Sequence, residues 1–237
     1  MSLRSAINRV GFAYASWISA REYRHQAFSG LNERPVEYAF LLRQVARFQP
    51  RTVLDVGTGA TALPALLRNC GCLVTAIDNI RDFWPSGMVN RHWHVIDDDI
   101  RHPSVVGPFD LIICVSVLEH ITTHDAAVEG MLRLLSDRGH LVITAPYSER
   151  SYCSNVYDLP GSDAKGRGLP FVAQTFSRHE LDRWLAAGAI VVEQEHWQFY
   201  DSDYWSVGAR LPTPRQVGRA DRHQLTCLLL ERRESLR

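Results

Sequence analysis

The chain has 237 residues, of which 46% are hydrophobic, enough to bury a full core in one globular domain with or without an appendage. Basic and acidic residues each number 26, so the formal net charge is zero. This balance argues against a broad phosphate-binding surface and against nucleic acid as a substrate. Lysine occurs once, at Lys165, which excludes a P-loop and most other lysine-based chemistry.

The number of cysteines and the hydropathy of the chain indicate in which cellular compartment the protein is expected. The cysteines are odd in number, and none forms the C-x-x-C pair of zinc or redox sites, so we interpret them as reduced thiols. No apolar run approaches the ~20 residues of a membrane span, and no signal peptide is visible at the N-terminus. We therefore expect a cytoplasmic protein with no membrane partner. The five cysteines are Cys70, Cys72, Cys114, Cys153 and Cys227.

Residues 1–50 show a helical pattern. Ile7, Val10 and Tyr14 recur at helical spacing, and Pro35 opens a second pattern of the same kind. We expect an N-terminal helical cap over residues 1–50 and a main domain over residues 51–237.

From Thr52 onward, short apolar runs alternate with helical stretches, a pattern typical of an α/β fold. We predict seven strands in an open, mostly parallel, Rossmann-like sheet with helices on both faces. The predicted strands are residues 52–56, 73–78, 92–97, 109–116, 140–146, 189–197 and 225–231.

Two further segments have clear signals. Ser177 and Glu180 have the spacing of a capping box, which predicts a helix start, and Gly188 is expected to end that helix. Residues 147–176 are polar and too long for a simple connection, so we expect a lid or an inserted substrate loop.

The stretch "TVLDVGTGATALP" contains the first candidate site. Gly57, Thr58 and Gly59 follow the first strand and precede a helix, so a ligand can lie against the bare backbone and face free N–H groups. Asp55 would repel a pyrophosphate but would attract an α-amino group. This turn therefore favours a ligand with an amino-acid moiety over a dinucleotide.

Acidic residues at the ends of the next two strands indicate further parts of this ligand. Asp78 ends the second strand, 19 residues beyond Gly59, where a carboxylate can accept from both hydroxyls of a ribose. Asp99 can accept from an adenine amino group while the backbone N–H of Ile100 faces the ring, with Asp98 as the alternative adenine contact. An amino acid, a ribose and an adenine together make up S-adenosylmethionine.

These motifs, in this order from Thr52 to Pro146, resemble the class I S-adenosylmethionine-dependent methyltransferases. Thr61 replaces the commonest third glycine, and "SDRGH" replaces the usual turn before the fifth strand. The resemblance implies that S-adenosylmethionine is bound and S-adenosylhomocysteine released. The implied cofactor contacts are Asp55, Gly57, Thr58, Gly59, Asp78, Asn79, Asp99, Ile100, Val115 and Ser116.

The resemblance also places "SVLEHI" beside the transferred methyl group. Glu119 and His120 are the catalytic candidates, with His120 either removing a proton from a hydroxyl acceptor or bracing the corner after the fourth strand. Some relatives carry E-x-x-E-H here and bind metal, but this chain has Ser116 in place of the first glutamate. His124 could restore a ligand, yet a solvated helix face is the better interpretation, and we expect no metal.

Other residues favour structural roles. Cys114 lies within an apolar strand and is expected to be a buried core thiol, and His92 and His94 are expected on one face of a sheet edge. Large aromatic residues after the sixth strand could wall an acceptor pocket or could belong to the core. They are Trp197, Phe199, Tyr200, Tyr204 and Trp205.

The resulting functional hypothesis is methylation of a small-molecule acceptor, on oxygen first and on nitrogen second. Two alternatives stay open at this point: a nicotinamide-dependent oxidoreductase and a non-catalytic subunit with the cofactor fold. Both a monomer and a homodimer are compatible with the sequence.

Overall fold

The computed structural model describes residues 2–28, 32–84, 86–163 and 171–233. By its internal contacts the chain forms two compact units, Met1–Val36 and Glu37–Arg237. The predicted division of the chain into a helical cap (residues 1–50) and a main domain (residues 51–237) stays a prediction. Within the described ranges, no helix is both long enough and apolar enough to cross a membrane.

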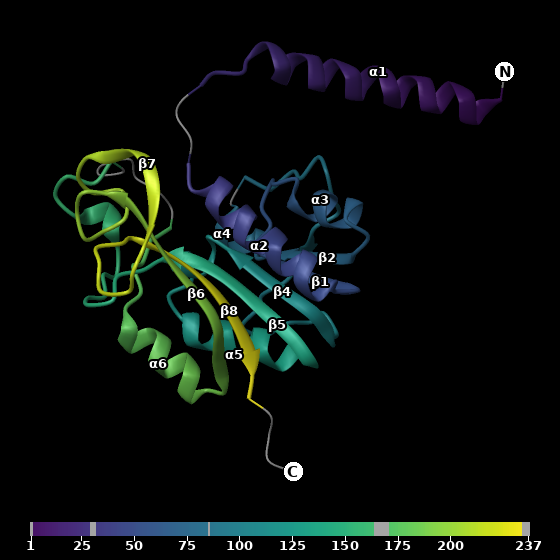
Figure 1. The fold of residues 1–237 in the computed structure, drawn as a ribbon. Coiled ribbons are helices and arrows are strands. Elements are labelled where there is room, and N and C mark those ends of the chain that lie inside the picture. Colours follow the sequence, from purple (N-terminus) through teal and green to yellow (C-terminus); the bar gives the residue numbers. More distant parts are fainter. Residues whose placement is uncertain (1, 29–31, 85, 164–170, 234–237) are drawn as a thin grey trace. The chain divides into compact units, whose positions relative to one another are not determined.

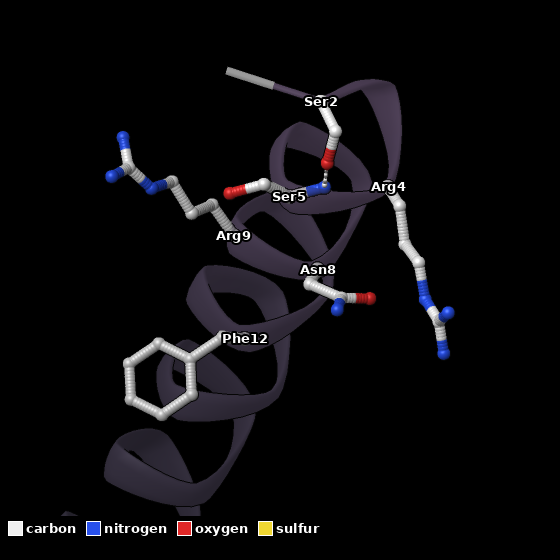
Figure 2. Close-up of a pocket in the computed structure, with 6 residues that line it drawn as sticks. All are labelled: Ser2, Arg4, Ser5, Asn8, Arg9 and Phe12. Atoms are coloured by element: carbon white, nitrogen blue, oxygen red, sulfur yellow. Dashed lines mark hydrogen bonds between the residues drawn. The ribbon is translucent and has the colours of Figure 1, made fainter.

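The first unit consists mainly of helix α1 (Leu3–Arg24), which has no buried residue. Ser2 caps this helix, because its hydroxyl accepts a hydrogen bond from the backbone N–H of Ser5 at 3.3 Å. Figure 2 shows the first turns of α1, with six side chains around an open hollow on its surface. These side chains belong to Ser2, Arg4, Ser5, Asn8, Arg9 and Phe12.

The second unit is built on one eight-stranded sheet, in the order β3-β2-β1-β4-β5-β8-β6-β7 (Figure 1). The strands from β3 to β5 in this order run parallel, and β8, β6 and β7 continue the sheet with antiparallel pairing. The strands are β1 (Thr52–Val56), β2 (Leu73–Asp78), β3 (Ile96–Asp97), β4 (Phe109–Val115), β5 (Leu135–Pro146), β6 (Ala189–Tyr200), β7 (Arg210–Val217) and β8 (Leu225–Arg232).

Helices cover both faces of this sheet, as predicted. Ala127 and Met131 of one helix and Trp184 of another join the main core with alternate strand residues such as Ile112 and Ile143. The other face is covered by α2, which is tied to β6 by an ion pair between Arg43 and Glu195. The helices are α2 (Arg34–Phe48), α3 (Leu63–Asn69), α4 (Ile80–Phe83), α5 (His124–Leu134) and α6 (Arg178–Ala186), with the 3-10 turns η1 (Leu118–His120) and η2 (Val156–Asp158).

The sheet differs from the prediction at its two edges. β7 was not predicted, since its run contains Pro212 and Pro214 and is mostly exposed; proline is tolerated there because β7 is an edge strand. β3 is shorter than predicted, because the side chain of Asn90 accepts from the N–H groups of His92 and Trp93 and holds them in a turn. The prediction that His92 and His94 lie on a strand is therefore wrong.

Two other predictions concern the region after β5. The capping box at Ser177 and Glu180 is confirmed, and α6 ends at Ala186, two residues before Gly188. In the segment 147–176, residues 147–163 and 171–176 are described, and bridges join Tyr147 to Phe176 and Cys153 to Thr175. The remaining part of the expected lid, residues 164–170, lies outside the described residues.

Candidate active site

The predicted cofactor residues lie at the carboxyl edge of the parallel strands. Asp55 of β1 pairs with Ala76 of β2 on one side and with Ile113 of β4 on the other. The strands end shortly afterwards, so the glycine turn after β1, Asp78 at the end of β2 and Ser116 after β4 share one edge of the sheet. In open α/β sheets, ligands bind at this edge.

The glycine turn is tightly built. Gly57 has φ +71°, and a Cβ atom there would lie 2.3 Å from Cγ1 of Val117. Glycine is therefore required by the chain that follows β4, and not only by the approach of a ligand. The N–H groups of Gly57 and Thr58 both donate to the carbonyl of Ile77, at 2.8 and 3.3 Å, which anchors the turn to β2.

Asp78 joins this turn directly. Its Oδ2 accepts from the N–H of Gly59 at 2.8 Å, and its Oδ1 accepts from the indole N–H of Trp84 at 3.0 Å. Burial raises the pKa of Asp78, while these two hydrogen bonds act in the opposite direction. The structure thus brings together two residues, Gly59 and Asp78, that sequence reasoning assigned to one ligand from motifs 19 positions apart.

Trp84 was not identified from the sequence. Its ring is the nearest group to the position of a Cβ atom on Gly59, at 3.4 Å, and the side chain is only partly buried. Asn90 holds the same turn from outside, because its amide group donates to the carbonyls of Gly59 and Thr61, both at 2.9 Å. An indole beside a bare glycine backbone and a carboxylate occupies the position expected for a ribose.

The expected adenine contacts form a polar cluster after β3. The Arg101 guanidinium donates to both carboxylate oxygens of Asp99, with N–O distances of 2.5 to 2.9 Å, and holds the pKa of Asp99 below its usual value. Asn79 caps α4 and lies 3.5 Å from Asp99, and Ile100 is buried. Each carboxylate oxygen has two lone-pair sites, so Asp99 retains capacity for a further donor.

Asp98 has a different role from Asp99. Its carboxylate accepts from the N–H groups of Asp99, Ser104 and Val105, all at 3.0 Å. These bonds organise the loop that follows β3. Asp98 therefore positions Asp99 and is the less suitable of the two for contacting adenine.

A buried carboxylate from α2 lies at the end of β4. Val115, also expected to contact the cofactor, is the last residue of that strand. Glu37 is 0% exposed, and its Oε1 accepts from the hydroxyls of Ser116 at 2.5 Å and Thr144 at 2.6 Å. Ser116 also adopts φ +49°, which is unusual for a residue with a side chain. An acid at the start of an apolar helical pattern was the available sequence signal for Glu37.

Two other acids act on Cys114, the penultimate residue of β4. Cys114 is fully buried, which confirms it as a core thiol. Burial raises the pKa of this thiol, and the negative charges of Glu119 and Asp55 raise it further. Asp55 and Glu119 are themselves 2% and 4% exposed. The structure therefore brings a predicted cofactor residue and a predicted catalytic residue to the same region.

His120 ends the 3-10 turn after β4 and is held by the segment 171–176. Its Nδ1 lies 2.6 Å from the carbonyl oxygen of Val172, and its ring packs edge-on against Phe171 at 4.7 Å. A carbonyl can only accept, so Nδ1 carries the hydrogen and, in the neutral ring, Nε2 carries the lone pair. This tautomer can accept a proton at Nε2.

His124 is not part of this group. It is buried between α5 and α6, where its ring nitrogens face the indole of Trp184 and the guanidinium of Arg183, each at 3.3 Å. Burial lowers the pKa of His124. The interpretation of His124 as part of a solvated helix face is wrong, because its ring packs against Phe176 and Trp184.

The aromatic residues after β6 pack mainly on one another. The ring of Trp205 contacts Phe199 and Tyr200 edge-on, at 5.1 and 5.3 Å, and the latter two residues are buried. Tyr204 shares a hydrogen bond with Ser151, and Trp197 donates to Glu195. This packing favours the core interpretation for Phe199 and Tyr200.

The donors and acceptors at the carboxyl edge fit S-adenosylmethionine. A carboxylate ends β2 next to a glycine turn, a second buried carboxylate precedes that turn, and a third follows β3. A dinucleotide pyrophosphate would meet negative charge at Asp55, whereas an α-amino group would be attracted to it.

Comparison with known proteins identifies the family. Residues 23–207 match the family described as a methyltransferase domain, which is most of the chain. The chain belongs to the class I S-adenosylmethionine-dependent methyltransferases. The methyltransferase uses S-adenosylmethionine as its methyl donor, and the oxidoreductase and non-catalytic alternatives are set aside.

Curated relatives of the methyltransferase are named for one activity. The ubiquinone biosynthesis O-methyltransferase of Xylella fastidiosa (strain M23) is 26% identical over 206 residues, which cover 82% of this chain and 80% of that protein. The enzyme of the same name from Xanthomonas oryzae pv. oryzae (strain PXO99A) is 26% identical over 176 residues, covering 70% and 72%.

Solved structures support the fold of the methyltransferase. The 1,6-didemethyltoxoflavin-N1-methyltransferase of Burkholderia thailandensis, solved with 1,6-didemethyltoxoflavin and S-adenosylhomocysteine, superposes with a TM-score of 0.57. The match covers 98% of this chain and 89% of that one, at 16% sequence identity. At this identity the likeness concerns the fold and not the acceptor.

Proposed function

We propose that this methyltransferase methylates a hydroxyl oxygen of a small molecule, with His120 as the general base. The observation that carries the proposal is the contact between Nδ1 of His120 and the carbonyl of Val172, at 2.6 Å. This contact orients the ring and leaves Nε2 as the proton acceptor. A hydroxyl must lose a proton during methyl transfer, so a base fixed in this tautomer suits an oxygen acceptor.

The cofactor residues have separate roles in this proposal. Asp78 would hold the ribose hydroxyls, Asp55 would attract the amino group of the methionine moiety, and Asp99 with the backbone of Ile100 would contact the adenine. Backbone N–H groups of the turn, including Thr58 and Gly59, would face the rest of that moiety. When bound, S-adenosylmethionine supplies an electrophilic methyl group for in-line transfer.

The residues after β4 would align the acceptor. Val115 ends that strand and Ser116 follows it, and Glu37 fixes the hydroxyl of Ser116 through a hydrogen bond. Glu119 is buried, and its carboxylate would stabilise positive charge near the site. The backbone carbonyl of Glu119 accepts from Gln174, which ties the His120 turn to residues 171–176.

The names of the curated relatives support oxygen as the attacking atom, at 26% identity over most of both chains. The test is turnover with matched pairs of small acceptors that differ only in carrying a phenolic hydroxyl or an amine at the same position. Formation of S-adenosylhomocysteine and of the methylated product is followed by mass spectrometry. Turnover of the hydroxyl compounds alone supports the proposal, and turnover of the amines alone would overturn it in favour of N-methylation.

A further inference from the structure

A second group of polar side chains lies outside the proposed active site. Glu149, His196 and His223 each offer one ligand atom, and these three atoms lie within 4.8 Å of one another. His196 and His223 are 7% and 3% exposed, and their ring centroids are 4.5 Å apart. No sequence motif indicated this group, since its members are separated by 47 and 27 positions along the chain.

Strand pairing explains why these residues meet. Pro146 at the end of β5 pairs with Leu225 at the start of antiparallel β8, and Leu225 also pairs with Trp197 of β6. Glu149 follows β5 and His223 precedes β8, so both lie at the carboxyl edge of the parallel strands. His196 reaches the same edge from β6.

The tautomer of His223 suits metal binding. Its Nδ1 lies 2.7 Å from the carbonyl oxygen of Asp221, so Nδ1 carries the hydrogen and Nε2 carries the lone pair. Metal-binding histidines usually donate their other ring N–H to a carboxylate, a backbone carbonyl or a water molecule, and so are oriented in the same way. The structure therefore already contains the hydrogen bond that would orient His223 as a metal ligand.

The Nε2 atoms of both histidines are buried, and neither has a hydrogen-bond partner among the residues that the structure describes. A buried polar atom without a hydrogen bond costs stability, so native proteins usually pair such atoms or use them. Two such nitrogens beside one carboxylate indicate a missing ligand shared by all three residues.

The charges around the group are compatible with a cation. Glu149 accepts from the hydroxyl of Tyr147 at 2.8 Å and forms an ion pair with Arg219, whose side chain is 58% exposed. Burial lowers the pKa of His223, and burial together with the charge of His223 lowers the pKa of His196 to about 4.

Other charged groups face these histidines. Arg150 is the further cation that acts on His223, and Asp221 is a further acid. Glu149 attracts positive charge to both rings. The two acids offset the exposed arginines, so the site is not strongly repulsive toward a divalent ion.

We propose that Glu149, His196 and His223 form a binding site for a divalent transition metal of the zinc type. Two imidazoles and one carboxylate are a common ligand set for zinc and for non-haem iron, and they leave at least one coordination position for water or another ligand. Ligand atoms around a tetrahedral zinc lie about 3.4 Å apart, so the side chains close inward by about 1 Å when the ion binds.

The test measures metal binding and not methyl transfer, so it is independent of the proposed function. The full chain is freed of metal with a chelator and titrated with Zn²⁺ against a chromogenic competitor, and with Co²⁺ for its absorption spectrum. His223→Gln and Glu149→Gln each remove one ligand, and His179→Gln alters an exposed histidine outside the group. Circular dichroism checks that each variant is folded.

We expect one tightly bound Zn²⁺ per chain and a Co²⁺ spectrum of nitrogen and oxygen ligation. Each ligand variant should lose at least about tenfold in Zn²⁺ affinity, and His179→Gln should match the wild type. Zn²⁺ should also raise the melting temperature of the wild type by more than that of folded Glu149→Gln. Wild-type affinity in the folded ligand variants, or no binding by the wild type itself, would overturn the proposal.

Discussion

The indole N–H of Trp84 donates a hydrogen bond to Oδ1 of Asp78 at 3.0 Å, while the N–H of Gly59 occupies the other carboxylate oxygen. If Asp78 holds the ribose of the cofactor, the indole hydrogen bond is exchanged for ribose hydroxyls on binding. The short helix α4 precedes Trp84 directly, and the side chain is 37% exposed, so it can move without disturbing the sheet.

Trp84→Phe removes this competing hydrogen bond and keeps an aromatic ring. A hydrogen bond to a charged group contributes ~1.5–3 kcal/mol at most, so we expect affinity for S-adenosylhomocysteine to rise by about threefold to tenfold. Isothermal titration calorimetry of wild type and variant measures the change. A weaker affinity in Trp84→Phe would contradict this account and would indicate that the indole N–H contributes to binding.

Asp78→Ala should have the opposite effect. It removes two charge-assisted hydrogen bonds to the ribose, each worth ~1.5–3 kcal/mol, so the affinity for S-adenosylhomocysteine should fall by at least about tenfold. Asp137→Ala is the control, because Asp137 is an exposed acid whose side chain is 88% accessible. Equal affinity in a folded Asp78→Ala variant would show that this carboxylate does not hold the ribose.

The variant His120→Ala distinguishes a catalytic role of His120 as a general base from a purely structural role. Loss of a general base should lower kcat by ~10²–10⁴-fold and leave cofactor affinity nearly intact. The wild-type rate should fall on acidification, because only the neutral imidazole accepts a proton, and the variant should lose this dependence. Initial rates across pH and calorimetry provide the two readouts, with His179→Ala as the exposed control.

If His120 only supports the corner after β4, a different result follows. The variant would then melt earlier and bind cofactor less tightly, since the contact with Val172 ties two segments together. Its pH profile would keep the wild-type shape. That combination would remove His120 from the proposed mechanism.

Glu37→Ala should destabilise the protein. The hydroxyls of Ser116 and Thr144 would lose a buried charged acceptor, which should lower the free energy of unfolding by about 2–4 kcal/mol. Glu129→Ala is the matched control, since that side chain is 53% exposed and its ion pair with Arg133 is long, at 4.0 Å. Urea unfolding of both variants measures the difference, and equal stability would contradict the importance of the Glu37 contacts.

His124 should make stability dependent on pH. Burial lowers its pKa in the folded state, so as pH falls below ~6.5 the unfolded chain takes up the proton first. The contribution is therefore complete above that pH and declines as the pH drops toward the lowered pKa. His124→Gln should flatten the slope of unfolding free energy against pH between about 7 and 5. An unchanged slope would show that the pKa of His124 is the same in the folded and unfolded states.

Several features of this protein follow from local sequence. The apolar runs predicted the positions of β1, β2, β4, β5, β6 and β8, because a strand buried on both faces needs a continuous apolar segment. The capping box at Ser177 and Glu180 was equally visible, since both partners lie within one helical turn. The acids and glycines of the cofactor motifs could be identified from the sequence for the same reason, because each motif lies within a few residues at the end of one strand.

Features that join distant segments needed the tertiary structure. Edge strand β7 has no apolar run, because in the described part of the chain it pairs on one side only and its residues stay mostly exposed. Trp84 and Glu37 reach the site from α4 and α2, and their partners are fixed only when the strands align. Hydrogen bonds of this kind depend on which strand ends are neighbours in space. The order of the strands in the sheet cannot be deduced from the spacing of residues along the chain.

The group of Glu149, His196 and His223 is the clearest case. Each residue looks ordinary in its own segment, and their ligand atoms come within 4.8 Å only because β8 is inserted antiparallel between β5 and β6. Local propensity and hydrophobic pattern determine where strands form, whereas the sheet order is decided by how the whole chain buries its apolar surface. For this protein the sequence alone therefore determined the family and its cofactor motifs, and the tertiary structure decided which side chains meet.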